Sequence, residues 1–438
     1  MTAGPSRGEA RPMRIVLYEP LGQGGICHYT YELSRALSQR GDCRVTLVTP
    51  DRYELESRPR AFRLRRFGRP SRIKRLLRLG PRRRAPALPR EDPAAPPAAG
   101  PERDEEDGDS SFSDLLSRVR RRVEQIGLAL QLVVWRADVV HFQWLDEYRD
   151  DFLLRLLRIF GLPLVYTAHN LLPHEDDEDL GTEALARILR KVDRIIVHSE
   201  SNRRELHALV GVEPGRVATI AHGSYELLLP EEEIGRAEAR RRVGFPAQGP
   251  IVLFFGLIRR YKGLEVLLEA FGEVERRFPS ARLAIVGQLL PTDDADFEYH
   301  SRLLAEASRR ESVLRVGEYV DIDRVGLYFL AADVVVVPYT RTSHSGVLMA
   351  ALAAGRPVVV TKTGAMPEVV EEGKTGFVVP PGDAAALAGA ISRLLEKPEM
   401  AARMGREASE HARRNFSWDS IAGRTIDLYR SMAGAHAA

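Results

Sequence analysis

The sequence predicts an α/β protein made of two Rossmann-like domains, whose parallel sheets face one another across a cleft. Three observations support this fold class. The chain has 438 residues, too many for one ordinary core and suited to two domains of roughly 200 residues each. Short β-branched runs alternate with segments of helical periodicity, the pattern of parallel α/β sheets. Hydrophobic residues make up 44% and charged residues 29%, a globular composition.

The candidate strands fall into two sets of six. Those of the first half are 14–18, 44–48, 139–142, 164–168, 194–198 and 217–221. Those of the second half are 251–256, 282–286, 313–316, 334–338, 357–361 and 377–379. Helices are expected between them; in 263–277, for example, Leu264, Leu267 and Phe271 share one face. The two halves join near 230–249.

The resulting organisation has four parts. We expect a flexible N-terminus, an N-terminal domain with an insertion at about 52–118, a C-terminal domain, and a final helix that packs back on the N-terminal domain. Their bounds are 1–12, 13–225, 226–415 and 416–438. Ligands of open α/β sheets bind at the carboxyl ends of the strands, so the functional loops should follow the strands.

Composition excludes several functions. Lys and Arg total 64 against 61 Asp and Glu, a net charge of +3 that argues against nucleic acid as a partner. The two cysteines, Cys27 and Cys43, suit a reducing cytoplasm and give no metal-ligand spacing. No stretch approaches the ~20 apolar residues of a membrane span, and residues 1–13 lack the apolar core of a signal peptide. We therefore expect a cytoplasmic protein.

The insertion is strongly charged. Residues 58–90 hold fourteen basic and no acidic residues, whereas 91–114 hold nine acidic residues and one Arg. Residues 85–112 bury too little apolar surface to offset ordering entropy and are expected to be disordered. The basic half, 58–84, interleaves apolar residues with arginines. Two interpretations stay open: it docks on an anionic membrane surface, or it is a solvated loop.

The loop at 19–28 follows the first strand. Gly24 and Gly25 let backbone amides approach a ligand at the start of the next helix, with His28 one turn later. The spacing is not G-x-G-x-x-G, so a dinucleotide-binding dehydrogenase loses support.

The loop at 166–175 gathers His169, Asn170, His174 and Glu175 at the end of an apolar strand. Because His169 and His174 lie five residues apart on a Pro-containing loop, hydrogen bonding to a hydroxyl-rich ligand is favoured over metal binding. A purely structural role for His169 is the alternative.

The loop at 255–263 has the features of a diphosphate site. Gly256 permits a close turn, and Arg259 and Lys262 place two cations beside a helix N-terminus, with Gly263 at its start. A solvated charged turn is the alternative interpretation.

Two later loops face the same region. After the strand at 334–338, the amides of Ser345, Gly346 and Val347 would point at an anion, and His344 is the titratable group of that turn. After the next strand, Glu368 could frame the same pocket. The pair Asp294 and Asp296, by contrast, opens a helix, where acidic residues favour the dipole without any metal.

Taken in order, these motifs resemble the family-4 glycosyltransferases, retaining enzymes of the GT-B fold. The resemblance covers about 13–50 and 133–430. The glycines at 24–25 resemble the family's acceptor-side loop, and 255–263 resembles its donor-diphosphate loop. The segments 345–347, 355–359, 364–368 and 376–383 resemble its C-terminal signature.

The resemblance implies transfer of a sugar from a nucleotide-diphosphate donor to an acceptor hydroxyl with retention, without a metal or other cofactor. Its catalytic residues would be His169, which orients the sugar, and Arg259 and Lys262, which neutralise the diphosphate. The donor-binding residues would be Gly256, Gly263, His344, Ser345, Gly346, Val347 and Glu368. The acceptor-binding residues would be Gly24, Gly25, His28, Asn170 and Glu175. The acceptor would be a carbohydrate or a lipid-linked molecule of polysaccharide or glycoconjugate synthesis. If the basic segment docks on anionic lipid, the enzyme would work at the inner face of the cell membrane.

One departure keeps two rivals open. Most family members carry two glutamates eight positions apart, and alignment on Gly355 places Thr342 and Ala350 there. A non-catalytic nucleotide-sugar-binding protein is therefore the alternative. A nucleotide-sugar 2-epimerase has only His169 and Glu175 as candidate acid–base groups.

Overall fold

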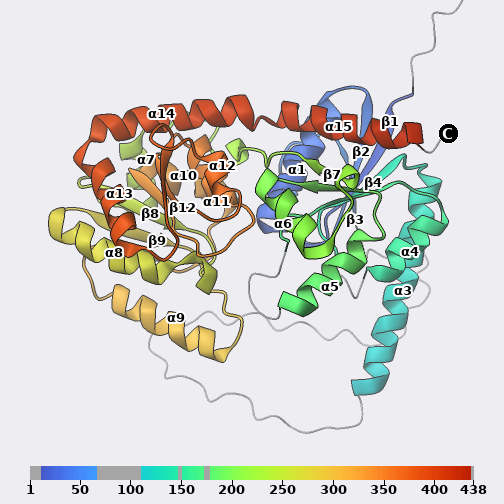
Figure 1. Ribbon diagram of the computed structural model, residues 1–438, viewed down its shortest axis with the longest axis horizontal. Coiled ribbons are helices and arrows are strands. Elements are labelled where there is room, and N and C mark those ends of the chain that lie inside the picture. Colours follow the sequence, from blue (N-terminus) through green and yellow to red (C-terminus); the bar gives the residue numbers. More distant parts are fainter. Residues whose placement is uncertain (1–10, 67–109, 147–149, 172–177, 436–438) are drawn as a thin grey trace, which may run out of the picture.

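The N-terminal domain is built on a parallel sheet with the strand order β3-β2-β1-β4-β5-β6-β7. The computed structural model describes residues 11–66, 110–146, 150–171 and 178–435 (Figure 1). The strands are β1 (Met13–Tyr18), β2 (Cys43–Thr49), β3 (Arg63–Arg66), β4 (Val139–Phe142), β5 (Leu164–Thr167), β6 (Arg194–Val197) and β7 (Val217–Thr219). The order reverses between β1 and β4, which places a ligand crevice at the carboxyl ends of these two strands.

Helices cover both faces of this sheet. They are α1 (Gly24–Gln39), α3 (Ser110–Val134), α4 (Asp151–Ile159), α5 (Glu178–Leu189) and α6 (Glu200–Val210). On one face Leu33 and Leu37 of α1 belong to the same hydrophobic core as Leu17 of β1. On the other face Leu132 of α3 and Leu154 of α4 join a separate core. The alternation of strand side chains between two buried faces explains why these strands read as continuous apolar runs.

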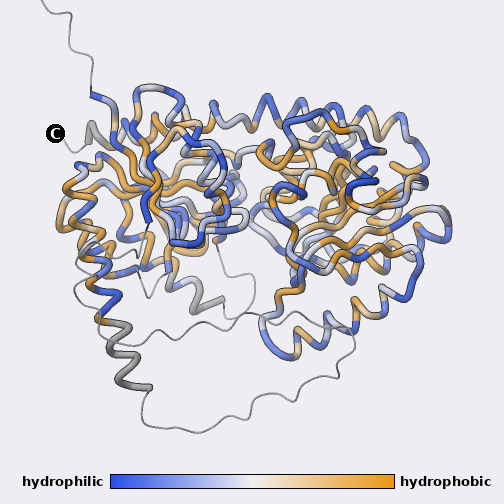
Figure 2. Tube along the Cα trace, turned by 180° about the vertical axis from the view of Figure 1, so that it is seen from behind, coloured by the Kyte–Doolittle hydropathy of each residue, from blue (hydrophilic) through white to orange (hydrophobic). Residues whose placement is uncertain are grey.

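The C-terminal domain repeats the plan with the strand order β10-β9-β8-β11-β12-β13. Its strands are β8 (Ile251–Phe255), β9 (Arg282–Val286), β10 (Val313–Val316), β11 (Val334–Val337), β12 (Val358–Thr361) and β13 (Gly376–Val379). Its helices are α7 (Arg236–Val243), α8 (Leu264–Arg277), α9 (Asp294–Ala307), α10 (Ile322–Ala331), α11 (Gly346–Ala353), α12 (Met366–Val369), α13 (Ala384–Glu396) and α14 (Pro398–Asn415). Figure 2 shows hydrophobic residues along the strands of both domains and hydrophilic residues on much of the outer helices.

The two domains are joined along one side by consecutive helices. Helix α14 lies over the C-terminal domain, and α15 (Trp418–Ala435) continues over the N-terminal domain, where it packs on α1 (Figure 1). At their junction the Trp418 indole N–H donates to the carbonyl of Ser224 at 2.8 Å. Gly223 is needed here, because a Cβ at that position would lie 2.3 Å from the Trp418 ring.

The fold prediction is confirmed. Each of the twelve predicted strands is present, with bounds that differ by at most two residues. The sequence analysis missed β3, an Arg-Leu-Arg-Arg edge strand without β-branched residues, and α3, which begins inside the charged insertion. Of the segment expected to be disordered, only 110–112 belong to the described residues, and they form the start of α3. The basic segment 58–84 is described only as far as Arg66. Among the described helices, none is long and apolar enough to cross a membrane.

Candidate active site

A cavity of about 720 Å³ lies between the carboxyl ends of the two sheets. Loops after β1, β5 and β7 form its N-terminal wall, and loops after β8, β9 and β11 form its C-terminal wall. The predicted site residues that line it are Gly24, Gly25, His28, His169, Asn170, Gly256, Arg259, Lys262, His344, Ser345, Gly346 and Val347. The structure thus brings most of the predicted residues to one cavity.

Lys262 is the buried cation of the C-terminal wall. Its side chain crosses Gly256, where φ is +105° and a Cβ would lie 2.9 Å from the Lys262 Nζ. The residue is only 7% exposed, and its Nζ lies 5.4 Å from the centroid of the Tyr339 ring. Burial, and then the nearby charge of Arg259, lower the pKa of Lys262 to about 8. A buried ammonium with this pKa is stabilised by an anion placed against it.

The start of α11 lies on the same wall. Ser345 caps this helix, because its hydroxyl oxygen accepts from the backbone N–H of Leu348 at 3.2 Å. The first residue, Gly346, packs against Tyr225 of the N-terminal domain, and a Cβ there would lie 2.8 Å from the tyrosine ring. The N-terminal amides and dipole of α11 therefore add to the positive potential of Lys262 and Arg259.

The N-terminal wall is built around buried histidines. His169 follows β5 and is hydrogen-bonded through Nε2 to Gln143 at 3.1 Å and through Nδ1 to the Nε2 of His198 at 3.2 Å. The Nδ1 of His198 lies 3.0 Å from the carbonyl of Ile220, which can only accept. His198 therefore donates to Ile220 from Nδ1, and its Nε2 can only accept. A neutral His169 carries one N–H and donates either to this nitrogen or to the side-chain oxygen of Gln143, so the two contacts fix the position of its ring rather than its tautomer.

These histidines are neutral groups. Burial, reinforced by neighbouring histidines, holds the pKa of His169 well below its ordinary value. Burial likewise lowers the pKa of His198 to about 4 and that of His222 to about 3. Tyr29 packs against all three rings, with centroids 4.8 to 5.3 Å away. At neutral pH this wall offers hydrogen bonds without a positive charge.

His344 brings a fourth histidine from the C-terminal domain. Its ring centroid lies 4.8 Å from that of His222 and 5.9 Å from that of His169. Ligand atoms of these three residues lie within 4.8 Å of one another, which is close enough for the set to hold a metal ion. The sequence analysis favoured no metal here and paired His169 with His174, which lies outside the described residues.

The glycine loop after β1 is held by a carboxylate. Glu54 accepts from the backbone N–H of Gly24 at 2.8 Å, from His28 at 2.9 Å and from the hydroxyl of Tyr319 at 2.9 Å. Burial raises the pKa of Glu54, but these hydrogen bonds outweigh it and hold the pKa at about 2. Tyr319 belongs to the C-terminal domain, so Glu54 also ties the two walls together.

The remaining predicted residues lie elsewhere. Gly263 adopts φ +64° behind the cavity, and a Cβ there would lie 2.1 Å from the carbonyl oxygen of Pro338, so it permits close packing of two loops. Glu368 does not line the cavity. Its carboxylate accepts from the backbone N–H groups of Glu200 and Ser201 at the start of α6, because that helix end presents free donors to it. Glu175 lies outside the described residues.

Several lining residues escaped the sequence analysis, chiefly His222 and Tyr225, together with Glu54 and His198 behind them. A signal existed: a histidine follows each of β5, β6 and β7 within three residues of the strand end. Thr342 and Ala350, aligned with the family's paired glutamates, both line the cavity.

Two Rossmann-like domains that enclose such a cleft have the architecture of the GT-B fold. A model described as Glycosyltransferase Family 4 matches residues 23–224, and one described as Glycosyl transferases group 1 matches residues 235–411. A D-inositol 3-phosphate glycosyltransferase of Corynebacterium glutamicum is 30% identical over 305 residues, which are 67% of this chain and 72% of that protein. The chain therefore belongs to glycosyltransferase family 4, and it is a glycosyltransferase.

Solved structures agree on the fold. Sucrose-phosphate synthase from Thermosynechococcus elongatus superposes with a TM-score of 0.71 at 24% identity, covering 97% of this chain and 100% of that one. Anabaena HepE in complex with UDP-glucose gives 0.70 at 18% identity, covering 96% and 100%. At these identities the likeness concerns the fold alone.

Proposed function

We propose that this enzyme transfers a sugar from a nucleotide-diphosphate donor to an acceptor hydroxyl, with retention at the anomeric carbon. One observation carries the proposal: the buried ammonium of Lys262, the guanidinium of Arg259 and the start of α11 lie on the same wall of the cleft. This arrangement matches the charge and size of a diphosphate.

The proposed step needs little covalent help from the protein. The bond between the anomeric carbon and the diphosphate oxygen breaks, and its electron pair stays on the diphosphate. The acceptor oxygen forms its bond on the same face, and its proton passes to an oxygen of the leaving diphosphate. Lys262, Arg259 and the α11 amides stabilise the negative charge that develops on the leaving group.

His169 would orient the transferred sugar. Its contacts with Gln143 and His198 hold the ring in place, and its low pKa keeps the ring neutral. A neutral imidazole suits hydrogen bonding to sugar hydroxyls and would not compete with Lys262 for the diphosphate.

We propose that turnover requires no metal or other cofactor, since the two cations and the helix start supply the charge that a metal would otherwise provide. The Anabaena neighbour, which binds UDP-glucose, supports a nucleotide sugar as donor. For the acceptor we propose a carbohydrate or lipid-linked hydroxyl of polysaccharide or glycoconjugate synthesis, used in the cytoplasm at the inner membrane face.

The donor is tested by thermal unfolding with a panel of UDP, GDP and ADP sugars and the free nucleoside diphosphates. A ligand at a hundredfold excess over its Kd stabilises the fold by about 2.7 kcal/mol. We expect one nucleotide to raise the Tm, and Lys262→Ala to abolish that rise. Retention is tested by NMR of the product anomer; an inverted product would exclude the proposed step.

The sequence analysis left a non-catalytic nucleotide-sugar-binding protein open, because Thr342 and Ala350 stand at the positions of the paired glutamates; membership of the family favours the enzyme. The non-catalytic alternative predicts the same rise in Tm without transfer to any acceptor and without donor hydrolysis.

A further inference from the structure

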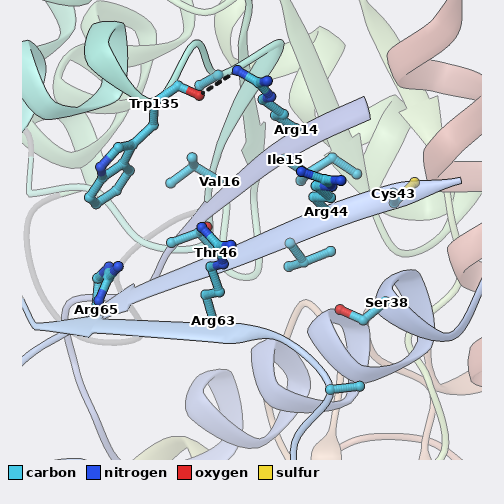
Figure 3. Close-up of a pocket in the computed structure, with 13 residues that line it drawn as sticks. Arg14, Ile15, Val16, Ser38, Cys43, Arg44, Thr46, Arg63, Arg65 and Trp135 are labelled. Carbon is cyan, nitrogen blue, oxygen red and sulfur yellow. Dashed lines mark hydrogen bonds between the residues drawn. The ribbon is translucent and has the colours of Figure 1, made fainter. Parts of the chain in front are cut away.

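A second cavity, of about 410 Å³, lies at the β2–β3 edge of the N-terminal sheet and shares no lining residue with the active-site cleft (Figure 3). Arg14, Arg44, Arg63 and Arg65 line it, together with Trp135. None of its described lining residues is acidic. We call it the arginine groove.

The strand register explains why the arginines gather there. Arg63 and Arg65 are two residues apart on β3 and therefore point to the same face of the sheet. Arg63 pairs with Thr46 of β2, and Arg44 precedes Thr46 by two residues, so Arg44 points to that face as well. Side chains of like charge at such spacing repel one another unless an anion lies between them.

Three of these arginines have no counter-ion within the part of the chain that the structure describes. Arg44, Arg63 and Arg65 are exposed, and among the described residues none of them forms an ion pair. The guanidinium of Arg65 lies 6.0 Å from the Trp135 ring, and Arg14 donates to the Trp135 carbonyl at 3.2 Å. Nearby arginines behave differently, since Arg58 pairs with Asp323.

Helix α3, which ends one residue before Trp135, carries apolar residues on two faces. Leu128 and Leu132 pack into the core. The opposite face is an exposed stripe made of Val119 (52% exposed), Val123 (64%), Ile126 (41%), Leu130 (50%), Val133 (38%) and Val134 (78%). At about 100° per residue these side chains share an arc of roughly 100°. A stripe this regular marks a surface that meets another apolar phase.

We propose that the arginine groove and the exposed stripe of α3 form one docking surface for an anionic phospholipid bilayer. The stripe enters the interface, the arginines bind lipid phosphates, and Trp135 lies between them at headgroup depth. Charge complementarity selects this occupant: a bilayer of anionic lipids offers both an apolar layer and a dense array of phosphates, as the surface requires. Helix α3 lies on the outer side of the N-terminal domain, away from the C-terminal domain, so docking leaves the cleft accessible (Figure 1).

The test uses the full-length protein and vesicles of phosphatidylcholine with or without 30% phosphatidylglycerol, in a flotation assay at several salt concentrations. We expect binding only to the anionic vesicles, and weaker binding at higher salt. Arg63→Ala with Arg65→Ala should weaken it about 25-fold, at about five-fold per arginine. Val123→Ser with Leu130→Ser should weaken it as well. Arg63→Lys with Arg65→Lys keeps the charge and should bind nearly as the parent protein does.

The matched control is Arg276→Ala with Arg309→Ala, which removes two exposed arginines of the C-terminal domain and should leave vesicle binding unchanged. Stabilisation by a nucleoside diphosphate should be unchanged in every variant, so failure here is distinct from failure of the proposed function. Three results would overturn the proposal: no flotation of the parent protein, equal loss of binding in the control, or saturation of the groove by inorganic phosphate with no preference for vesicles.

Discussion

The two walls of the cleft differ in charge: the C-terminal wall is positive, and the buried histidines of the N-terminal wall are neutral. The C-terminal wall gathers positive charge, from Lys262, Arg259 and the start of α11. The N-terminal wall gathers groups that also titrate, His169 and His222, yet burial keeps them neutral. The comparison shows that burial alone does not decide the charge of a site. Lys262, with an ordinary pKa of 10.5, stays largely protonated at pH 7 when burial lowers it to about 8, whereas a histidine loses its charge entirely.

This division of charge matches a reaction with one charged and one neutral partner. A diphosphate leaving group needs fixed positive charge, whereas sugar hydroxyls need oriented donors and acceptors. This difference can be tested by removing positive charge from the C-terminal wall or by adding it to the N-terminal wall.

The largest effect is expected from Lys262→Ala, which removes the buried charge of the C-terminal wall. Loss of one preorganised stabilising group should lower kcat by about 10²–10³-fold. Steady-state kinetics with the donor identified by thermal unfolding would measure this. Lys262→Arg should recover part of the loss. The exposed Lys397→Ala in the same domain should have no effect; equal losses in both variants would refute the role given to Lys262.

The second prediction concerns acid stability. In the folded protein His198 has a pKa of about 4 and His222 of about 3, against an ordinary value of 6.5. Below pH 6.5 these two histidines are therefore protonated in the unfolded chain, whereas they stay neutral in the folded chain until the pH approaches 4. The free energy of unfolding should be constant with respect to these groups above pH 6.5 and should fall as the pH drops toward 4, by at most ~1.4 kcal/mol per pH unit for each histidine.

Denaturant unfolding at a series of pH values would measure this slope. His198→Gln removes one of the titrating groups and should make the slope shallower by about one proton. A free energy of unfolding that stays constant from pH 6.5 to 4 would mean that the N-terminal wall is not neutral.

A smaller effect is expected where the walls touch. Gly346→Ala places a Cβ 2.8 Å from the Tyr225 ring, and such overpacking costs typically 1–3 kcal/mol. Gly389→Ala is the matched control, because it lies in α13 with nothing within 4 Å and should be neutral or slightly stabilising. Unfolding free energies and donor KM values of both variants would separate a loss of stability from a shift of the α11 amides.

The fold was largely predictable from the sequence because each domain repeats one rule, a buried β-branched run followed by an amphipathic helix. The exceptions follow from the same rule. Strand β3 is an edge strand of arginines and carries no apolar run, and α3 is apolar on two faces, so its exposed stripe hides the usual period.

The site was predictable where chemistry follows directly after a strand, as for Lys262 and His169. It was not predictable where a partner comes from a distant segment. Glu54, which holds Gly24 and His28, lies beyond the second strand, and only tertiary packing brings it to the first loop. Glu368 was expected to line the cavity, but its carboxylate instead accepts hydrogen bonds from the start of α6. This is a contact between the two domains, and no local sequence pattern predicts it.

The smallest effect is expected from a metal chelator, and it tests the comparison most directly. His169, His222 and His344 lie close enough to hold a metal ion, which would turn the neutral wall into a cationic one. Because Lys262 and Arg259 already supply positive charge, we expect kcat and KM to be unchanged after dialysis against EDTA. The variant His344→Gln removes one possible metal-binding side chain but keeps a hydrogen-bond donor at that position. If EDTA abolished turnover and Zn²⁺ restored it in the parent protein but not in His344→Gln, the histidines would be a metal centre. Both walls of the cleft would then carry positive charge, rather than the C-terminal wall alone.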